Sequence, residues 1–264
     1  MVGARFEHVF LMRRNLRRAF PRGLVTRLEG STLLALTRRG KYLLAALSSG
    51  HTVLIHLGMS GSFRIERRLR VTGDGFDPDS GEPERHDHVI FHMSSGATVF
   101  FNDPRRFGSV GLAQTTRLTT HASMRGLGPE PLEASFDAAV LAAACADRTA
   151  PIKVALLDQR VVAGVGNIYA SEALHRAGVS PRRPASRLTS SSGRPSESAA
   201  RLVVAIKEVL NEAIDRAEGR TYRSSRFRVY EREGEPCVKK GCAGTITRMA
   251  QAGRSTFYCP RCQR

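Results

Sequence analysis

Four cysteines near the C-terminus are spaced like the ligands of a metal ion. Cys237 and Cys242 form one close pair, and Cys259 and Cys262 form a second pair after sixteen intervening residues. Two such pairs can place four sulfurs around one tetrahedron with no open position, which is typical of structural rather than catalytic Zn²⁺. The spacing therefore predicts one structural zinc ion, with two disulfides or free thiols as the alternative.

A turn with two glycines offers a second chemical site. Helices are predicted over 151–158 and 167–178, and Gly164 and Gly166 allow a tight turn between them. Unpaired backbone amides at the start of a helix can bind phosphate. The segment therefore predicts a helix–turn–helix-like DNA grip with Asn167 at the anion site, whereas an ordinary N-cap is the alternative role of Asn167.

The elements before residue 120 are predicted to be strands. Apolar runs flank two Ser-Ser-Gly turns, and these runs are 41–47, 52–57, 88–93 and 97–102. Two hairpins with this turn chemistry favour an antiparallel sheet or sandwich. The segment Gly73–Glu84, rich in Gly, Pro and Asp, is predicted to be a surface loop.

The chain after residue 120 is predicted to be helical. A helix is expected over 136–146 with Ser135 as its cap, and a 3.6-residue apolar stripe predicts a core-facing helix over 198–217. The fifth cysteine, Cys145, lies in the first of these helices and is expected to be buried.

The last residues are predicted to form a zinc-clamped hairpin with strands at 245–249 and 255–258. Because this module is so short, metal binding must supply the free energy that folds it. The chain is thus divided into a strand-rich domain, a helical domain and a linker with the cysteine module, over 1–120, 121–220 and 221–264.

The charge of the chain favours a polyanionic partner. There are 41 Lys and Arg residues against 24 Asp and Glu residues, a net charge of +17. Such a charge indicates nucleic acid or an anionic membrane as the partner. No apolar run reaches the roughly 18 residues of a membrane span, and residues 1–20 lack the apolar core of a secretory signal. Nucleic acid is therefore the favoured partner.

Seven motifs follow one another between residues 38 and 262. They are RRGKYLL at 38–44, IHLGMSG at 55–61, HDHV at 86–89, DPRRFG at 103–108, LGPEPL at 127–132, GVGNIYAS at 164–171, and the four-cysteine module. Together they resemble the formamidopyrimidine-DNA glycosylase and endonuclease VIII family of base-excision repair enzymes. Met59 with Arg105 and Phe107 is similar to the formamidopyrimidine branch of that family.

The resemblance implies a fold and an activity. The fold is α+β, with an N-terminal antiparallel β-sandwich and a C-terminal helical domain that holds a helix-two-turns-helix and a zinc-finger hairpin. The implied enzyme is a bifunctional glycosylase and AP lyase. It removes formamidopyrimidine and 8-oxoguanine from double-stranded DNA and cleaves abasic sites by β,δ-elimination. It is expected to act as a monomer in the bacterial cytoplasm and nucleoid, with no membrane partner.

The resemblance also implies roles for three side chains that fill the gap left by an extruded nucleotide. A glycosylase cannot reach a stacked base, so it flips the nucleotide out and plugs the hole. Met59 would wedge into the stack, Arg105 would hydrogen-bond the orphaned cytosine, and Phe107 would kink the partner strand. From residue type alone, Met59 and Phe107 are ordinary core residues instead.

Further residues match positions that hold the DNA backbone. Those implied to clamp phosphates around the flipped nucleotide are Lys41, His56, Arg148 and Asn167. His86 matches another DNA contact, Lys41 also matches a proton donor in β-elimination, and Arg254 matches an arginine of δ-elimination. Apart from these motif positions, lysines and arginines on so basic a chain would be solvated surface charges.

The first residues differ from the family pattern. The family begins Pro-Glu-Leu-Pro-Glu, where the proline amine attacks C1′ and the glutamate serves as general acid and base. This sequence begins MVGARF, which resembles the family just after its first helix. Three hypotheses follow: a native start further upstream, a catalytically inactive protein that binds damaged DNA, or an enzyme that uses another amine such as Lys41.

The segment 218–228 looks shorter than the family loop that closes over the oxidised base. DNA binding is therefore expected to resemble that of the family more closely than lesion choice does.

Overall fold

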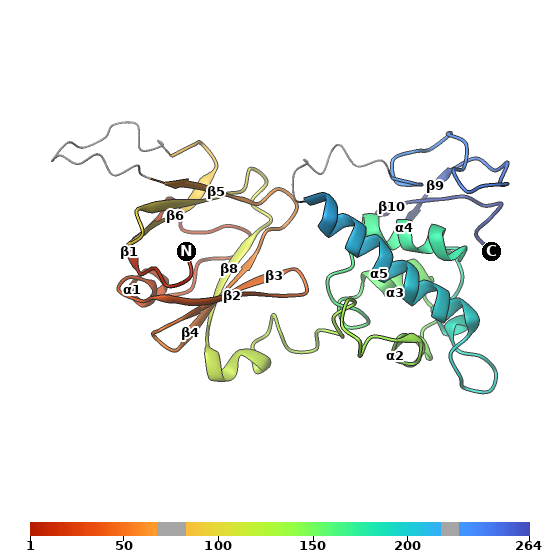
Figure 1. The fold of residues 1–264 in the computed structure, drawn as a ribbon, viewed down its shortest axis with the longest axis horizontal. Helices are drawn as coiled ribbons and strands as arrows, with labels where there is room; N and C mark the ends of the chain where they lie inside the picture. The colour runs from red at the N-terminus through yellow and green to blue at the C-terminus, as the bar shows by residue number, and fades with distance from the viewer. Residues whose placement is uncertain (68–82, 218–226) are drawn as a thin grey trace. The chain divides into compact units, whose positions relative to one another are not determined.

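The computed structural model describes residues 1–67, 83–217 and 227–264. They form two compact units, Met1–Arg125 and Gly126–Arg264, each with its own hydrophobic core (Figure 1). Most of the predicted loop 73–84 and most of the segment 218–228 lie outside the described residues.

Two four-stranded antiparallel sheets form the described part of the first unit. One has the order β1-β6-β7-β5 and the other the order β2-β3-β4-β8. The strands are β1 (Phe6–Leu11), β2 (Leu33–Arg39), β3 (Tyr42–Leu47), β4 (His51–His56), β5 (Ser62–Arg67), β6 (Asp87–Met93), β7 (Ala97–Asn102) and β8 (Ser109–Gln114). The short helices α1 (Leu24–Leu28) and η1 (Thr115–Thr120) accompany them. Both predicted hairpins are confirmed, since β3 pairs with β4 and β6 pairs with β7.

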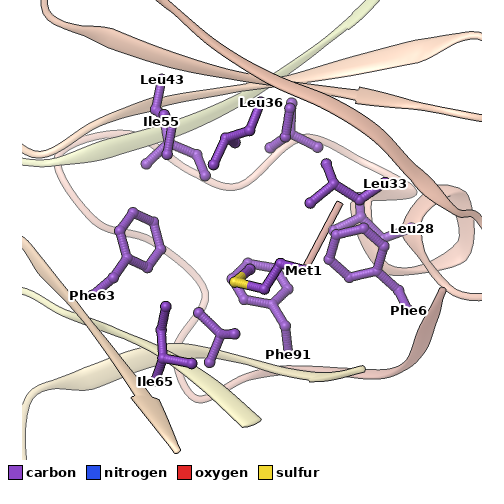
Figure 2. Close-up of a pocket in the computed structure, with 13 residues that line it drawn as sticks. Met1, Phe6, Leu28, Leu33, Leu36, Leu43, Ile55, Phe63, Ile65 and Phe91 are labelled. Atoms are coloured by element: carbon purple, nitrogen blue, oxygen red, sulfur yellow. The ribbon is translucent and has the colours of Figure 1, made fainter. Parts of the chain in front are cut away.

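Apolar side chains of both sheets fill the core of the first unit. They also line a cavity of about 120 Å³ whose lining residues are all apolar. Figure 2 shows Leu43 and Ile55 on one side of this cavity, Phe63 and Ile65 on the other, and Met1 between them. A phosphate or sugar placed there would lose its hydrogen bonds to water without replacement. The cavity is therefore unsuited to bind a phosphate or a sugar.

Helices packed on a common core form most of the second unit. They are α2 (Ala138–Cys145), α3 (Ile152–Leu157), α4 (Asn167–Ala177), η2 (Ala185–Leu188) and α5 (Glu197–Ala217). The predicted stripe of α5 is buried at Leu202, Ile206 and Val209, and Cys145 is fully buried as expected. None of the described helices is long and apolar enough to cross a membrane.

The predicted cap of α2 was wrong. The helix begins at Ala138, and the Asp137 carboxylate accepts a hydrogen bond of 2.8 Å from the Val140 amide. Ser135 instead donates a long hydrogen bond to Glu133. Asp137 has the advantage because its carboxylate reaches the amide three residues ahead, the geometry of an N-cap.

A two-stranded hairpin ends the chain. Strands β9 (Thr247–Gln251) and β10 (Arg254–Tyr258) pair antiparallel through a turn at Ala252 and Gly253, both with positive φ. Two positive φ values in a two-residue turn match the right-handed twist of a hairpin. The predicted hairpin is thus confirmed, with its first strand shifted two residues toward the C-terminus.

Candidate nucleic-acid interface

The four C-terminal cysteines form a site that fits zinc. Their Sγ atoms all lie within 4.8 Å of one another, with 3.8 Å between Cys237 and Cys262 and 3.7 Å between Cys242 and Cys259. A Zn–S bond of about 2.3 Å gives a tetrahedron with edges of about 3.8 Å. All five cysteines of the chain are free, so the disulfide alternative is wrong.

Gly244 makes room for this sulfur cluster. A Cβ atom at this position would lie 2.6 Å from the Sγ of Cys259 and 3.3 Å from that of Cys242. The backbone thus approaches two of the sulfurs closely at a position where only glycine fits.

Two loops of the first unit present the three predicted gap-filling side chains. Met59 lies in the turn between β4 and β5, while Arg105 and Phe107 lie between β7 and β8. Met59 is 69% exposed and Phe107 is 44% exposed. The Arg105 guanidinium lies 4.7 Å from the centre of the Phe107 ring. The alternative that Met59 and Phe107 are core residues is therefore wrong. We call the exposed group of Met59, Arg105 and Phe107 the candidate wedge.

One buried carboxylate fastens these two loops together. Asp103 accepts hydrogen bonds from the Ser60 hydroxyl at 2.6 Å and from the Gly108 amide at 2.7 Å. The same hydroxyl accepts the Arg105 amide at 3.1 Å. Nothing near Asp103 in the sequence indicates this role, because its main partner Ser60 is 43 positions away.

The loops are also in direct backbone contact. A Cβ atom on Gly58, which has φ +67°, would meet the Phe107 carbonyl carbon at 2.5 Å. The position of Met59 relative to Phe107 is thus set by close packing as well as by Asp103.

Lys41 and His56 lie near each other beside this wedge. The Nδ1 atom of His56 accepts the Gly58 amide at 2.9 Å, and the Tyr42 ring packs edge-on at 5.0 Å from the imidazole. Burial, Lys41 and Arg17 lower the pKa of His56, so its imidazole is neutral near pH 7. The site thus combines cations with a neutral ring.

His86 is half-buried just before β6, and its carbonyl accepts the Asp103 amide at 3.0 Å.

In the second unit, Asn167 joins α4 to the zinc hairpin. Its Oδ1 accepts Lys153 Nζ at 2.7 Å, and its Nδ2 donates to the Ser255 carbonyl at 3.0 Å. The N-cap of α4 is Gly166, with no side-chain hydrogen bond, so the N-cap alternative for Asn167 is wrong. No side chain caps the first amides of α4, and amides at such a position can bind an anion.

Lys153 is a functional candidate that the sequence analysis missed. The side chain is fully buried and also donates to the Ser255 carbonyl at 3.0 Å and to Thr256 Oγ1 at 2.6 Å. Burial and the nearby Arg254 lower its pKa to about 8, so it is still mainly protonated at pH 7. The available signal was a single lysine in the apolar run of 152–157.

Lys153→Met is expected to destabilise the second unit by about 2 kcal/mol and to weaken DNA binding. The variant keeps the volume but removes three charge-assisted hydrogen bonds, while it relieves the cost of burying the amine. Urea unfolding and DNA titration measure both effects. Lys207→Met is the control, since the half-buried Lys207 donates a single solvent-exposed hydrogen bond, to the Glu133 carbonyl. Equal stability of the two variants would contradict a structural role of Lys153 in this joint.

Glu172 holds the segment that follows residue 226. Its buried carboxylate accepts hydrogen bonds from the backbone amides of Arg228, Val229 and Tyr230 at 2.8–2.9 Å.

Arg148 is fixed by hydrogen bonds to the Ala144 carbonyl and to Asp158. Arg254 begins β10 and is exposed.

Three family models match the chain in order. They describe the formamidopyrimidine-DNA glycosylase N-terminal domain over residues 1–110, the H2TH domain of the same enzyme over 127–225, and a zinc finger found in FPG and IleRS over 234–264. The last match and the sulfur geometry agree that the module binds one structural zinc ion.

Proteins similar to this chain are named formamidopyrimidine-DNA glycosylase. The formamidopyrimidine-DNA glycosylase of Azorhizobium caulinodans is 51% identical over 275 residues, covering 99% of this chain and 94% of the relative. That of Rhodopseudomonas palustris strain BisA53 is 51% identical over 277 residues, covering 100% of this chain and 94% of the relative.

Solved structures of DNA complexes have the same fold. The Lactococcus lactis enzyme with FAPY-dG-containing DNA matches with a TM-score of 0.83 and 28% identity, covering 100% of this chain and 94% of the other. MutM in complex with carbocyclic 8-oxo-G-containing DNA matches with a TM-score of 0.84, the same identity and the same coverage.

Proposed function

This chain belongs to the formamidopyrimidine-DNA glycosylase family, and on that premise we propose that it is a bifunctional DNA glycosylase and AP lyase. It removes oxidised purines from double-stranded DNA and cleaves the resulting abasic strand by β,δ-elimination. The observation that supports this best is the exposed wedge of Met59, Arg105 and Phe107, fastened by Asp103. Similar proteins have been solved with DNA that contains an AP site, carbocyclic 8-oxo-G or FAPY-dG, lesions of the kind that this function requires.

The wedge is suited to hold an extruded nucleotide out of the stack. Extrusion leaves an apolar gap and an unpaired base in the opposite strand. Met59 enters the gap, Arg105 donates hydrogen bonds to the orphaned base, and Phe107 inserts beside it and kinks the duplex. The contact between Arg105 and Phe107 orients the guanidinium before DNA arrives.

The remaining candidates hold phosphates. In the first unit these are Lys41 and His56, and in the second unit Arg148, Asn167 and Arg254. His86 makes a further DNA contact. Lys41 also supplies a proton in β-elimination, and Arg254 serves δ-elimination. The uncapped amides of α4 add donors to the phosphate site at Asn167.

The relatives are bacterial, so we place this protein in the bacterial cytoplasm with the nucleoid, acting as a monomer. The boundaries 1–120, 121–220 and 221–264 remain our proposal for its domains.

Borohydride trapping tests the proposed reaction. A lyase of this kind joins an amine to C1′ of the sugar as an imine, which borohydride reduces to a stable covalent complex. Protein purified from its own cells should be trapped on a duplex that contains 8-oxoguanine, and mass spectrometry of the linked peptide identifies the amine. Tight binding without any trapped complex would favour the inactive damaged-DNA-binding protein. If trapping disappears in Lys41→Ala but not in Lys41→Arg, the positive charge of Lys41 supports the reaction without being the nucleophile. A peptide linked at Lys41 would make Lys41 the nucleophile.

Duplex binding is expected to weaken steeply with salt. If Lys41, Arg148 and Arg254 each neutralise one phosphate, the log–log slope of the binding constant is about −2.7, so doubling the salt weakens binding roughly sixfold. Arg254→Met should reduce the steepness by about 0.9, whereas Lys207→Met should leave it unchanged. Fluorescence anisotropy at several salt concentrations measures this slope. A binding constant that does not depend on salt would contradict the phosphate-holding roles.

A further inference from the structure

A buried histidine of α4 lies against one of the zinc-site sulfurs. His175 is 1% exposed, and its Nε2 lies 3.3 Å from the Sγ of Cys237, 62 positions along the chain. Within the described residues, its other ring nitrogen, Nδ1, is buried and has no hydrogen-bond partner. Among the described residues, the Cys237 sulfur is therefore the hydrogen-bond partner of this ring.

The chemistry of the two groups decides the direction of the hydrogen bond. A zinc-bound cysteine is a thiolate, which only accepts, so the ring must donate. A neutral imidazole carries one N–H. Placing it on Nδ1 would bury a donor without a partner, whereas placing it on Nε2 pairs it with the sulfur. The Cys237 sulfur otherwise receives the Lys239 amide at a long 3.5 Å.

We propose that His175 is a positioning residue that donates a hydrogen bond from Nε2 to the zinc-bound thiolate of Cys237 and thereby slows the loss of zinc. Four thiolates around one Zn²⁺ carry a net charge of −2, and a donated N–H disperses part of that charge and fixes the direction of the sulfur. This inference goes beyond the proposed function and does not depend on the reaction that the protein catalyses.

Helix α4, which carries His175, contacts the zinc module at both of its ends. At the end of α4, the Gly178 carbonyl accepts the Arg264 amide at 3.2 Å, and Gln263 donates to the Val179 carbonyl while it accepts the Cys259 amide. At the beginning of α4, Asn167 bonds to Ser255 of the hairpin. Helix α4 is therefore fastened to the zinc module at both ends, and His175 is the side chain among these contacts that reaches a sulfur.

The test compares two replacements of His175 in the whole protein without DNA. His175→Phe keeps a flat ring but has no donor, and His175→Gln keeps an N–H at nearly the same reach. The rate at which zinc passes to a chelating dye should rise about tenfold to a hundredfold in His175→Phe and stay near the original value in His175→Gln. The thiolate charge-transfer bands of the Co²⁺-substituted protein should shift in His175→Phe and be restored in His175→Gln.

His88→Phe is the matched control. His88 is another buried histidine with an unpartnered Nδ1, but its Nε2 pairs with the Asp103 carbonyl in the first unit. Its replacement should leave zinc release unchanged. Equal release from His175→Phe and the original protein would overturn the proposal, and so would fast release from His175→Gln. If His175→Phe cannot be purified with zinc while His175→Gln holds it normally, the requirement for a donor is still demonstrated.

Discussion

Cys259→Ala is expected to abolish zinc binding and to unfold residues 234–264, while the helical core of the second unit remains folded. Structural zinc contributes about 10–16 kcal/mol of apparent binding free energy, which exceeds what a module of this size gains from its apolar contacts. The apolar cluster of the module, around Val229, Ile246 and Phe257, is separate from the core formed by α2 to α5. Removing one ligand therefore removes the energy that folds the module and little of the energy that folds the helices.

The consequences should extend to DNA binding. An unfolded hairpin no longer presents Arg254, and it leaves Asn167 and Lys153 without their partners at Ser255 and Thr256. We expect the affinity for duplex DNA to fall by more than tenfold, since each lost charge-assisted hydrogen bond is worth about 1.5–3 kcal/mol.

Zinc content and hydrogen exchange followed by mass spectrometry check this prediction. Exchange should become fast in 247–258 and stay slow in 152–157 and 197–217. Cys145→Ala is the control. Cys145 is a buried free cysteine of the helical core, and it does not belong to the cluster of four sulfurs. A protected hairpin with bound zinc in Cys259→Ala would show that the ligand set is assigned wrongly.

Asp103→Ala is expected to destabilise the first unit by about 4 kcal/mol and to remove most of the preference for damaged DNA. The Gly108 amide loses its acceptor in a buried position, and the Ser60 hydroxyl loses the partner that orients it toward Arg105. Each buried polar group without a partner costs about 1–3 kcal/mol. The two loops then no longer hold Met59 and Phe107 in a fixed relation, so the energy of filling the gap is lost.

Comparing the affinities for abasic and intact duplexes distinguishes loss of the wedge from general destabilisation of the protein. Binding to a duplex with an abasic site should weaken at least tenfold more than binding to an intact duplex, because phosphate contacts are made with both. Asp137→Ala is the matched control: this carboxylate also accepts a backbone amide, but it caps α2 in the second unit and should cost about 1 kcal/mol with no change in the ratio of the two affinities. An unchanged ratio in Asp103→Ala would refute the fastening role.

Local features of this protein could be predicted from the sequence because their signals lie within a few residues. The hairpins β3–β4 and β6–β7 follow from apolar runs around Ser-Ser-Gly turns, and both pair as predicted. The extent of α4 follows from its flanking glycines. The zinc site follows from the spacing of two cysteine pairs, since close ligands in sequence are close in space. The cap of α2 was missed because two candidate oxygens lie two residues apart, and only the backbone geometry selects between them.

The family motifs also predicted that Met59, Arg105 and Phe107 act together. The residue types alone did not decide whether Met59 and Phe107 lie in the core or on the surface. That was decided by the turns between β4 and β5 and between β7 and β8, which leave both side chains exposed. The partners of three buried polar side chains could be identified only from the tertiary structure. Asp103 meets Ser60 across 43 positions, His175 meets Cys237 across 62, and Lys153 meets Thr256 across 103. A buried polar side chain takes its role from the partner that satisfies it, and nothing near these residues in the chain indicates a partner so distant in sequence.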